Sequence, residues 1–454
     1  MDSLLDFERA PEYPKPKAED FDGGIMAQPT EEARRELMRA RRTQDEDALA
    51  RIRQARQERQ RLDRGQIARM RRWWLGRMIE TGRPLEEKLT LFWHGHFATS
   101  YRTIENSYHL FLQNELFRRH AAGSFAGLLR SIIRDPAMLA YLDNNENRKG
   151  RPNENLAREL MELFTLGEGA YAERDIKEGA RALTGYSFEG NGFVFRGADH
   201  DDGPKSILGR SGRLTGDDFV AAVLEKPACA DFIASRVYRF FVGEIPPKGD
   251  PKRAPVVGLV RSLAGTLRAA RYEMKPMLRR LFLSEHFHDR EGAPARIKSP
   301  AELVVGAVRS LRTPTRDLGE LTRVMEMMGQ SLFFPPSVAG WEGGRSWINS
   351  STLFARANAL RYLLTGQPQG GDGAPDGDER YDPAPMIEGL DHRARAEPAL
   401  LARELLNRTL CVETTPEKEK ALAGYLRSLA REDLSTAVAG ALSLVTAMPE
   451  YQLC

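Results

Sequence analysis

Residues 152–185 read PNENLARELMELFTLGEGAYAERDIKEGARALTG, and this stretch carries the clearest signals of fold and function in the chain. Asn153 follows Pro152 at the position of a helix N-cap, where its side chain can accept hydrogen bonds from free backbone N–H groups. The helix is predicted to end at Gly167, because glycine adopts the left-handed conformation that closes many helices. Its apolar face consists of Leu156, Leu160, Leu163 and Phe164.

A polar stripe follows one edge of this apolar face. Asn155, Glu159 and Glu162 recur at the spacing i, i+4 and i+7, which places them on the same side of a helix. The simplest interpretation is a solvated face on which Glu162 pairs with Arg158, an interaction worth about 0.3–0.5 kcal/mol. However, Leu166 lies on the same face as both acids, which favours a partly buried polar site.

The rest of the chain is dominated by helical periodicity. The predicted class is mainly α: an orthogonal or irregular array of many helices with one small β-hairpin at residues 186–195, where Gly190-Asn191-Gly192 forms the turn. Four parts are predicted. They are an N-terminal helical arm at 1–80, a main helical domain at 81–366, a Gly-, Pro- and Asp-rich linker at 367–386, and a C-terminal helical segment at 387–454 that packs on the main domain. Residues 30–81 of the arm fit one long helix or two.

Composition restricts the classes of function. The 454 residues are 41% apolar and 29% charged, with a net charge of +3, so composition does not indicate a nucleic-acid-binding protein. Acids interspersed among the arginines of residues 30–81 favour a solvated face over a phosphate-binding one. The three cysteines, Cys229, Cys411 and Cys454, match neither a disulfide framework nor a metal motif. No apolar run reaches the roughly 18–20 residues of a membrane span.

Several segments resemble a bacterial family known as domain of unknown function 1800 (DUF1800). The resemblance spans about residues 70–365, and the family carries no reaction that transfers to this chain. The segments that carry it are LFWHGHFATS (91–100), LAYLDNNENRKGRPNENLARELMELFTLGEGAY (139–171), IKEGARALTGYSF (176–188), DHDDGPKSILG (199–209), KSPAELVVGAVRSL (298–311) and MGQSLFFPPSVAGWEGGRSWINSSTLFARAN (328–358).

The resemblance also implies a partner and a possible export route. Family members tend to be encoded beside a secreted sulfatase-like protein, which makes such a protein a candidate partner. Members typically carry an upstream helix with a His-Leu-Leu-Arg-Arg-Ala-like motif, sometimes preceded by an export signal. The chain as written has no signal peptide and is expected to be cytoplasmic. If its N-terminus is truncated, an exported or periplasmic protein is expected instead.

Two histidines in the segment 91–100 have the His-x-His spacing of many metal sites. In those sites the pair lies on a strand, whereas the pattern here is helical, so His94 and His96 point about 200° apart and cannot share one metal. His96 lies on the apolar side of its helix and points inward. It is either a core histidine with a polar partner or a functional group, and the sequence leaves both interpretations open.

Two loops supply further candidates. His200, Asp201 and Lys205 lie in a segment whose glycine and proline fix the backbone, although an Asx-turn explains this composition equally well. The second loop has aromatic and amide side chains around three glycines, which suits a carbohydrate or peptide ligand, although core packing is the commoner role of tryptophan. Its candidates are Gln330, Trp341, Trp347 and Asn349.

Together these features predict a polar cleft with two alternative functions. In the first, the protein is a hydrolase in which Glu159 or Glu162 is the general base or binds a divalent cation, His96 is a second ligand or proton carrier, and Lys205 is an electrostatic stabiliser. In the second, the protein is a non-catalytic binding or assembly module whose partner is the sulfatase-like protein. The residues expected to bind the substrate are Asn153, Asn155, His200, Asp201, Gln330, Trp341, Trp347 and Asn349.

Overall fold

A computed structural model describes residues 2–16, 20–27, 29–289, 296–367, 380–429 and 433–454. The predicted class is confirmed, because 63% of the structure is helical. In the described ranges, the β structure consists of two antiparallel hairpins, β1 (Tyr186–Glu189) with β2 (Gly192–Phe195) and β3 (Lys205–Ile207) with β4 (Arg210–Gly212). The first is the predicted hairpin. The second lies in a segment predicted as a loop, and its turn places Leu208 and Gly209 at φ of 51° and 87°.

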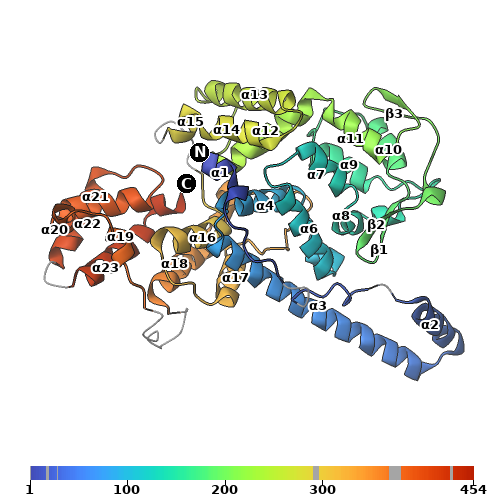
Figure 1. Ribbon diagram of the computed structural model, residues 1–454, viewed down its shortest axis with the longest axis horizontal. Coiled ribbons are helices and arrows are strands. Elements are labelled where there is room, and N and C mark those ends of the chain that lie inside the picture. Colours follow the sequence, from blue (N-terminus) through green and yellow to red (C-terminus); the bar gives the residue numbers. More distant parts are fainter. Residues whose placement is uncertain (1, 17–19, 28, 290–295, 368–379, 430–432) are drawn as a thin grey trace.

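Part of the N-terminal region, beginning at residue 31, forms an arm that projects from the rest of the molecule, whereas Leu5 and Phe7 before it belong to the core (Figure 1). Short α1 (Asp2–Leu5) precedes α2 (Glu31–Thr43) and the 35-residue α3 (Glu46–Glu80). The arm therefore contains two helices, which meet at Gln44 in the left-handed conformation. The first half of α3 is mostly exposed, whereas its last turns are buried around Trp74, Leu75 and Met78.

The middle of the chain forms a first group of helices around one hydrophobic cluster. The cluster includes Phe97, Phe125 and Tyr238. The helices of this group are α4 (Pro84–His96), α6 (Ser107–Arg119), α7 (Phe125–Ile132), α8 (Pro136–Tyr141), α9 (Asn155–Glu162), α10 (Glu173–Ala182), α11 (Gly216–Leu224), α12 (Pro227–Phe241), α13 (Arg253–Ala269), α14 (Met274–Phe282) and α15 (Glu285–His288). The short α5 (Tyr101–Ile104) packs in a second cluster instead.

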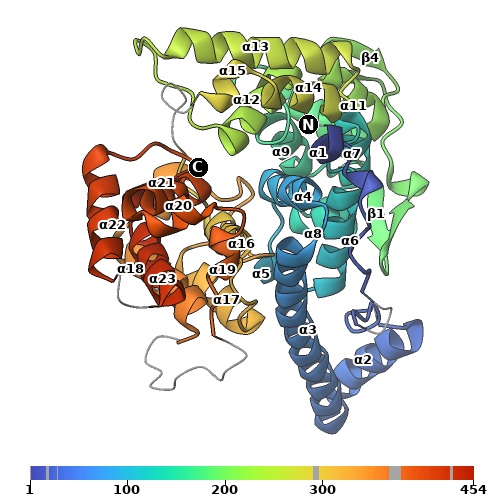
Figure 2. The same ribbon diagram turned by 60° about the vertical axis from the view of Figure 1, so that its left-hand side comes forward.

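The remaining helices surround a second cluster, which also takes in the buried end of α3. They are α16 (Pro300–Leu311), α17 (Leu318–Met327), α18 (Ser350–Thr365), α19 (Ala384–Ile387), α20 (His392–Ala396), α21 (Pro398–Thr409), α22 (Pro416–Ser428) and α23 (Leu434–Thr446). Figure 2 shows this group on one side of α3 and α4 and the first group on the other. Helices α16–α18 thus share a core with the C-terminal segment. Residues 368–379 of the predicted linker lie outside the described residues.

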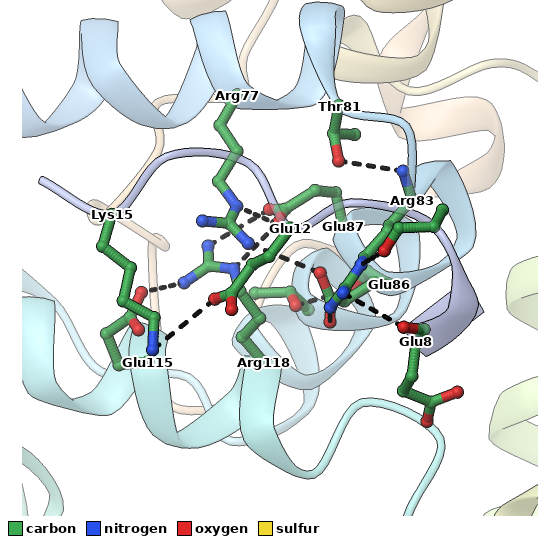
Figure 3. A network of polar contacts seen from close by, with 12 residues as sticks. Glu8, Glu12, Lys15, Arg77, Thr81, Arg83, Glu86, Glu87, Glu115 and Arg118 are labelled. Carbon is green, nitrogen blue, oxygen red and sulfur yellow. Dashed lines mark hydrogen bonds and ion pairs between the residues drawn. The ribbon is translucent and has the colours of Figure 1, made fainter. Parts of the chain in front are cut away.

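A buried network of charges joins α3, α4 and α6 (Figure 3). Glu87 Oε1 accepts hydrogen bonds from Arg77 Nε at 2.5 Å and Arg118 Nε at 2.7 Å, and Glu87 Oε2 accepts from Trp74 Nε1 at 2.9 Å. Burial acts to raise the pKa of Glu87, but Arg118 and Arg77 outweigh it and hold the pKa below its ordinary value. The network fixes the position of α4, the helix that carries His96.

Candidate functional site

A pocket of about 360 Å³ opens between the two groups of helices. We call it the central pocket. It is lined by the last turns of α4, the end of α12, the segment that leads into α16, and residues 330–347. Its volume lies within the range of about 300–1,000 Å³ that is typical of small-molecule sites. Four of the predicted site residues line it, namely His96, Gln330, Trp341 and Trp347.

His96 is almost completely buried at the end of α4. Its Nε2 lies 2.9 Å from the carbonyl oxygen of Phe164, which can only accept, so Nε2 carries the proton and donates. Nδ1 then presents a lone pair, and it has no hydrogen-bond partner among the residues described. Burial, reinforced by the charge of Arg236, lowers the pKa of His96 to about 3. His96 is therefore neutral at physiological pH and offers an acceptor in place of a charge.

Arg236 projects from α12 into the same pocket. Within the described parts of the chain, no carboxylate lies within ion-pair distance of it, and Glu244 instead pairs with Arg239 at 3.5 Å. Burial, followed by repulsion from Arg239, lowers the pKa of Arg236. A partly desolvated guanidinium without a carboxylate is an incompletely compensated charge, and such groups are favourable sites for anions.

A second arginine of the pocket has a carboxylate partner. Arg296 makes two hydrogen bonds to Glu302, at 2.7 and 2.5 Å, and Lys88 makes a third at 2.8 Å. Burial acts to raise the pKa of Glu302, but Lys88 and Arg296 hold it well below its usual range. Glu302 also accepts from Ser299 N in the capping box that begins α16. This cluster forms a rigid wall of the pocket.

Aromatic rings and an amide complete the lining. Trp341 packs against His94 with a distance of 5.5 Å between ring centroids, and Phe92, Phe240 and Trp347 form further apolar walls. Gln330 Oε1 accepts from the backbone N–H of Ala301, which leaves its amide nitrogen as a donor at the pocket. The central pocket thus combines apolar walls with the partly buried cation of Arg236, one amide donor and one neutral imidazole, and Glu342 and Arg345 lie at its exposed edge.

The acids of α9 lie outside this pocket. Glu162 accepts a hydrogen bond of 2.8 Å from the hydroxyl of Tyr171, and Glu159 acts electrostatically on Tyr141. Both acids are half-buried, and burial followed by repulsion from Glu162 raises the pKa of Glu159. Arg158 pairs with Glu154 and Glu173 instead of Glu162. The structure links α9 to the central pocket through its backbone, by the bond from His96 to Phe164.

The asparagines near α9 organise the backbone. Asn153 Oδ1 accepts from the N–H of Asn155, and Asn153 N–H donates to Asn147 Oδ1. Asn147 Nδ2 in turn donates to the carbonyl oxygen of Ala180 at 3.0 Å, near the end of α10. Asn155 itself is exposed. Gly167 adopts the predicted left-handed conformation with φ of 76°.

The loop at 200–205 is held by its own contacts. His200 Nδ1 donates to the carbonyl oxygen of Thr184 at 2.8 Å, and Lys205 Nζ donates to the carbonyl oxygens of Asp201 and Gly203. Both oxygens of Asp201 bind Arg181, which lowers the pKa of Asp201 to about 2. The structure does not bring Lys205 to the central pocket.

Two further expectations concern metal and membrane. In the ranges that the structure describes, no group of three or more His, Cys, Asp or Glu side chains is placed to hold a metal ion. His96, Glu159 and Glu162, which were predicted as metal ligands, do not form such a group there. None of the described helices combines the length and the apolar character needed to cross a membrane.

Comparison with known proteins identifies the family. The family model described as protein of unknown function, DUF1800, matches residues 13–453. The chain belongs to the DUF1800 family. Comparison with curated proteins finds no significant match, and comparison with solved structures finds none either. The match confirms the resemblance and extends it from about residues 70–365 to nearly the whole chain.

The six segments that resemble the DUF1800 family separate into two spatial groups. Segments 91–100, 298–311 and 328–358 meet at the central pocket. Segments 139–171, 176–188 and 199–209 instead meet around α10, through the bonds of Asn147, Thr184 and Asp201. Asn349 belongs to the first group but caps α18, where its side chain accepts from Thr352 N at 2.9 Å.

Sequence reasoning missed the arginines of the central pocket. Arg236 and Arg239 occur in a segment read only as a helix, without any motif. Two arginines three positions apart, the second next to Phe240, are common on a solvated helix and attract no attention. The helical spacing could have indicated this site. Ile233 and Phe240 lie at i−3 and i+4 from Arg236, which places this cation next to the apolar face of the helix.

Proposed function

We propose that the protein binds a small anionic ligand with an apolar part in the central pocket. The observation that carries this proposal is Arg236, a partly buried guanidinium that lacks a carboxylate partner in the described chain and faces a pocket of suitable size. A carboxylate, phosphate or sulfate group on the ligand would supply the missing charge. The amide nitrogen of Gln330 would donate a further hydrogen bond, and Trp341 and Phe240 would cover the apolar part.

The imidazole of His96 fits binding better than proton transfer. A general base needs a pKa near the operating pH, whereas the pKa of His96 is lowered to about 3. An anion beside Arg236 would remove part of the repulsion that keeps His96 neutral. Ligand binding is therefore expected to raise the pKa of His96, while burial keeps it below its ordinary value.

The test uses thermal denaturation with aromatic anions. Phenylacetate and phenyl phosphate are titrated against the protein, with neutral phenylacetamide as the control ligand. At least one anion should stabilise the wild type, and Arg236→Gln should weaken its binding about 10–100-fold, since hydrogen bonds to charged groups contribute about 1.5–3 kcal/mol. Arg51→Gln, on the exposed face of α3, is the matched control. Equal binding of phenylacetamide, or unchanged binding by Arg236→Gln, would contradict the proposal.

A hydrolase centred on α9 is the second candidate. The observation behind it is the half-buried pair of Glu159 and Glu162 on one side of α9, in which burial and repulsion from Glu162 raise the pKa of Glu159, as in many acid–base sites. Glu159→Gln and Glu162→Gln would then abolish hydrolysis of chromogenic esters or glycosides without lowering the melting temperature. If the two acids have only a structural role, the reverse is expected. Glu162→Gln should then lower the free energy of unfolding by about 1–3 kcal/mol, because the hydroxyl of Tyr171 loses its charged acceptor. The wild type should show no hydrolytic activity.

Association with a sulfatase-like protein is a proposal that rests on the family resemblance. It is compatible with the central pocket, because a binding module can use one surface for a partner and a pocket for a ligand. Co-expression with the product of a neighbouring sulfatase-like gene, followed by size-exclusion chromatography, tests it. Separate elution of the two proteins at micromolar concentration would argue against a stable complex.

A further inference from the structure

A second pocket lies on the other side of Glu302 from the central pocket. Its volume is about 240 Å³, and it opens between α4 and α16 near the end of α3. We call it the α4–α16 pocket. Its two sides come from regular helix faces, with Pro84, Lys88 and Leu91 on α4 and Ala301, Val305 and Arg309 on α16. These positions follow the spacings i, i+4 and i+7 or i+8, so the pocket is a groove between two helices.

The floor of this pocket is apolar and is left open by a glycine. Met78, Leu91 and Val305 contribute hydrocarbon, and Gly306 lies between them in the interior of α16. A Cβ atom at Gly306 would meet no other atom within 4 Å. Glycine inside a helix is less stable than alanine, and no neighbouring group requires it here. Its effect is to keep the groove free of a side chain.

The rim of the pocket carries two cations without a carboxylate partner. In the chain as described, Lys298 Nζ donates to the carbonyl oxygen of Tyr451 at 2.8 Å and forms no ion pair. Arg309 Nη1 likewise binds only backbone carbonyls, those of Met78, Ile79 and Thr81 at the end of α3. Burial lowers the pKa of Lys298, whose Nζ also lies 4.3 Å from the centre of the Tyr451 ring, whereas Arg309 is exposed. Two cations without a carboxylate partner at the edge of an apolar groove favour an anionic amphiphile.

The acids that line this pocket do not neutralise that rim. Glu87 is held by Arg77 and Arg118 in the buried network, and Glu302 is held by Arg296 and Lys88. Among the charged side chains that line the pocket, those without a carboxylate partner in the described chain are Lys298 and Arg309. Both lie outside the central pocket.

We propose that the α4–α16 pocket binds a medium-chain aliphatic carboxylate. Its alkyl chain would lie along Leu91, Val305 and Gly306, and its carboxylate would meet the rim formed by Lys298 and Arg309. The size is suitable, because an apolar cavity of about 150 Å³ accommodates benzene and 240 Å³ therefore leaves room for a chain of about eight carbon atoms. The site is independent of the anion proposed for the central pocket.

Octanoate is the probe, and isothermal titration calorimetry on the full chain is the measurement. Octanoate should bind the wild type with a measurable heat, whereas octanamide, which has the same chain without the charge, should bind about tenfold or more weakly. Arg309→Gln and Lys298→Gln should each weaken octanoate binding by a similar factor and leave octanamide binding unchanged. Arg236→Gln, in the central pocket, should change neither.

Gly306→Leu tests the location. The substitution places a side chain in the groove without removing a contact, and leucine has a higher helix propensity than glycine. The variant should therefore melt at the same temperature as the wild type or higher, and it should lose octanoate binding. Undiminished octanoate binding by folded Gly306→Leu would overturn the proposal. Absence of binding to the wild type at millimolar octanoate, or equal affinity for octanamide, would also overturn it. If Gly306→Leu does not fold, Arg309→Gln decides the question, because Arg309 is exposed and its substitution removes only its bonds to the backbone carbonyls at the end of α3.

Discussion

Gly340 lies so close to Gly95 that a Cβ atom on Gly340 would stand 2.1 Å from the carbonyl oxygen of Gly95. This contact joins the loop that carries Trp341 to the last turn of α4, which carries His96. Gly340 also has φ of 79°, a conformation that disfavours side chains. The shape of the central pocket therefore depends on two glycines that are 245 residues apart in the sequence.

Gly340→Ala is expected to destabilise the protein and open the central pocket. The left-handed backbone alone costs about 1–3 kcal/mol for a residue with a side chain, and the clash adds to this because the obstacle is backbone. Melting temperature measures the effect. The control is Gly258→Ala in the interior of α13, where a Cβ atom would meet nothing within 4 Å and a small gain in stability is expected. Equal melting temperatures for the two variants would contradict this account.

The local pattern of the sequence was sufficient to predict the hairpin β1–β2 and the buried face of α9, but not the bounds of this helix. Its N-cap is Glu154 in place of Asn153, and the helix ends at Glu162, before the predicted stop at Gly167. The apolar stripe of Leu156 and Leu160 is fully buried, and Gly167 has the left-handed conformation that was expected of it. These features depend on neighbours within a few residues. The hairpin β3–β4 escaped prediction because its turn places Leu208 at positive φ, which residue type does not indicate.

The candidate site depended on contacts that local pattern does not contain. His96 was predicted to point inward, and it does, but its partner is the backbone of Phe164 and not a side chain. Glu159 and Glu162 are half-buried as anticipated, yet Tyr171 and Tyr141, from neighbouring segments, set their surroundings. Arg236 lacks a carboxylate partner in the described chain because Glu244 pairs with Arg239 instead, and only the fold determines this pairing.

Glu87→Gln is expected to destabilise the protein strongly. The change removes the carboxylate that Arg77 and Arg118 share, which leaves Arg77 only Glu86 at 3.4 Å and Arg118 only Glu115 as negative partners. Removal of one member of a buried ion pair costs about 3–5 kcal/mol when no other partner remains, so the expected loss is about 3 kcal/mol or less. Urea denaturation measures the free energy of unfolding. Glu58→Gln, in the exposed pair with Arg61, serves as the control and should leave the melting temperature unchanged. A loss for Glu87→Gln no larger than that for Glu58→Gln would show that the network does not stabilise the junction of α3, α4 and α6.

Asp135→Asn is expected to remove one pH dependence of stability. Burial raises the pKa of Asp135 to about 7, well above the value of about 3.9 in an unfolded chain. Between about pH 4 and 7 the unfolded state releases this proton while the folded state retains it, so stability falls as pH rises through that window. An asparagine carbonyl can still accept from Met138 N and Gln113 Nε2, which both bind Oδ2. At pH 8 the variant should therefore be more stable than the wild type by about 2–4 kcal/mol, with little difference at pH 4.

His96→Gln is expected to reduce the loss of stability in acid. Burial lowers the pKa of both His94 and His96 to about 3, against about 6.5 in an unfolded chain. Both therefore contribute stability above pH 6.5 that is lost as pH falls toward 3, at about 1.4 kcal/mol per pH unit for each histidine. Glutamine removes one of these titrations and can still donate to the carbonyl oxygen of Phe164.

The measurement is the free energy of unfolding in urea at pH 7, 6 and 5. All proteins compared also carry Asp135→Asn, which serves as the background, because the titration of Asp135 changes stability with pH in the opposite direction to that of the histidines. His96→Gln should reduce the acid-induced loss by less than half, because burial also lowers the pKa of His94, His109 and His120, and these histidines still contribute. His392→Gln, at an exposed position in α20, should leave the slope unchanged. A slope for His96→Gln equal to that of the background would show that the pKa of His96 in the folded protein is close to its unfolded value of about 6.5, and the strongly lowered pKa of this imidazole would have to be abandoned.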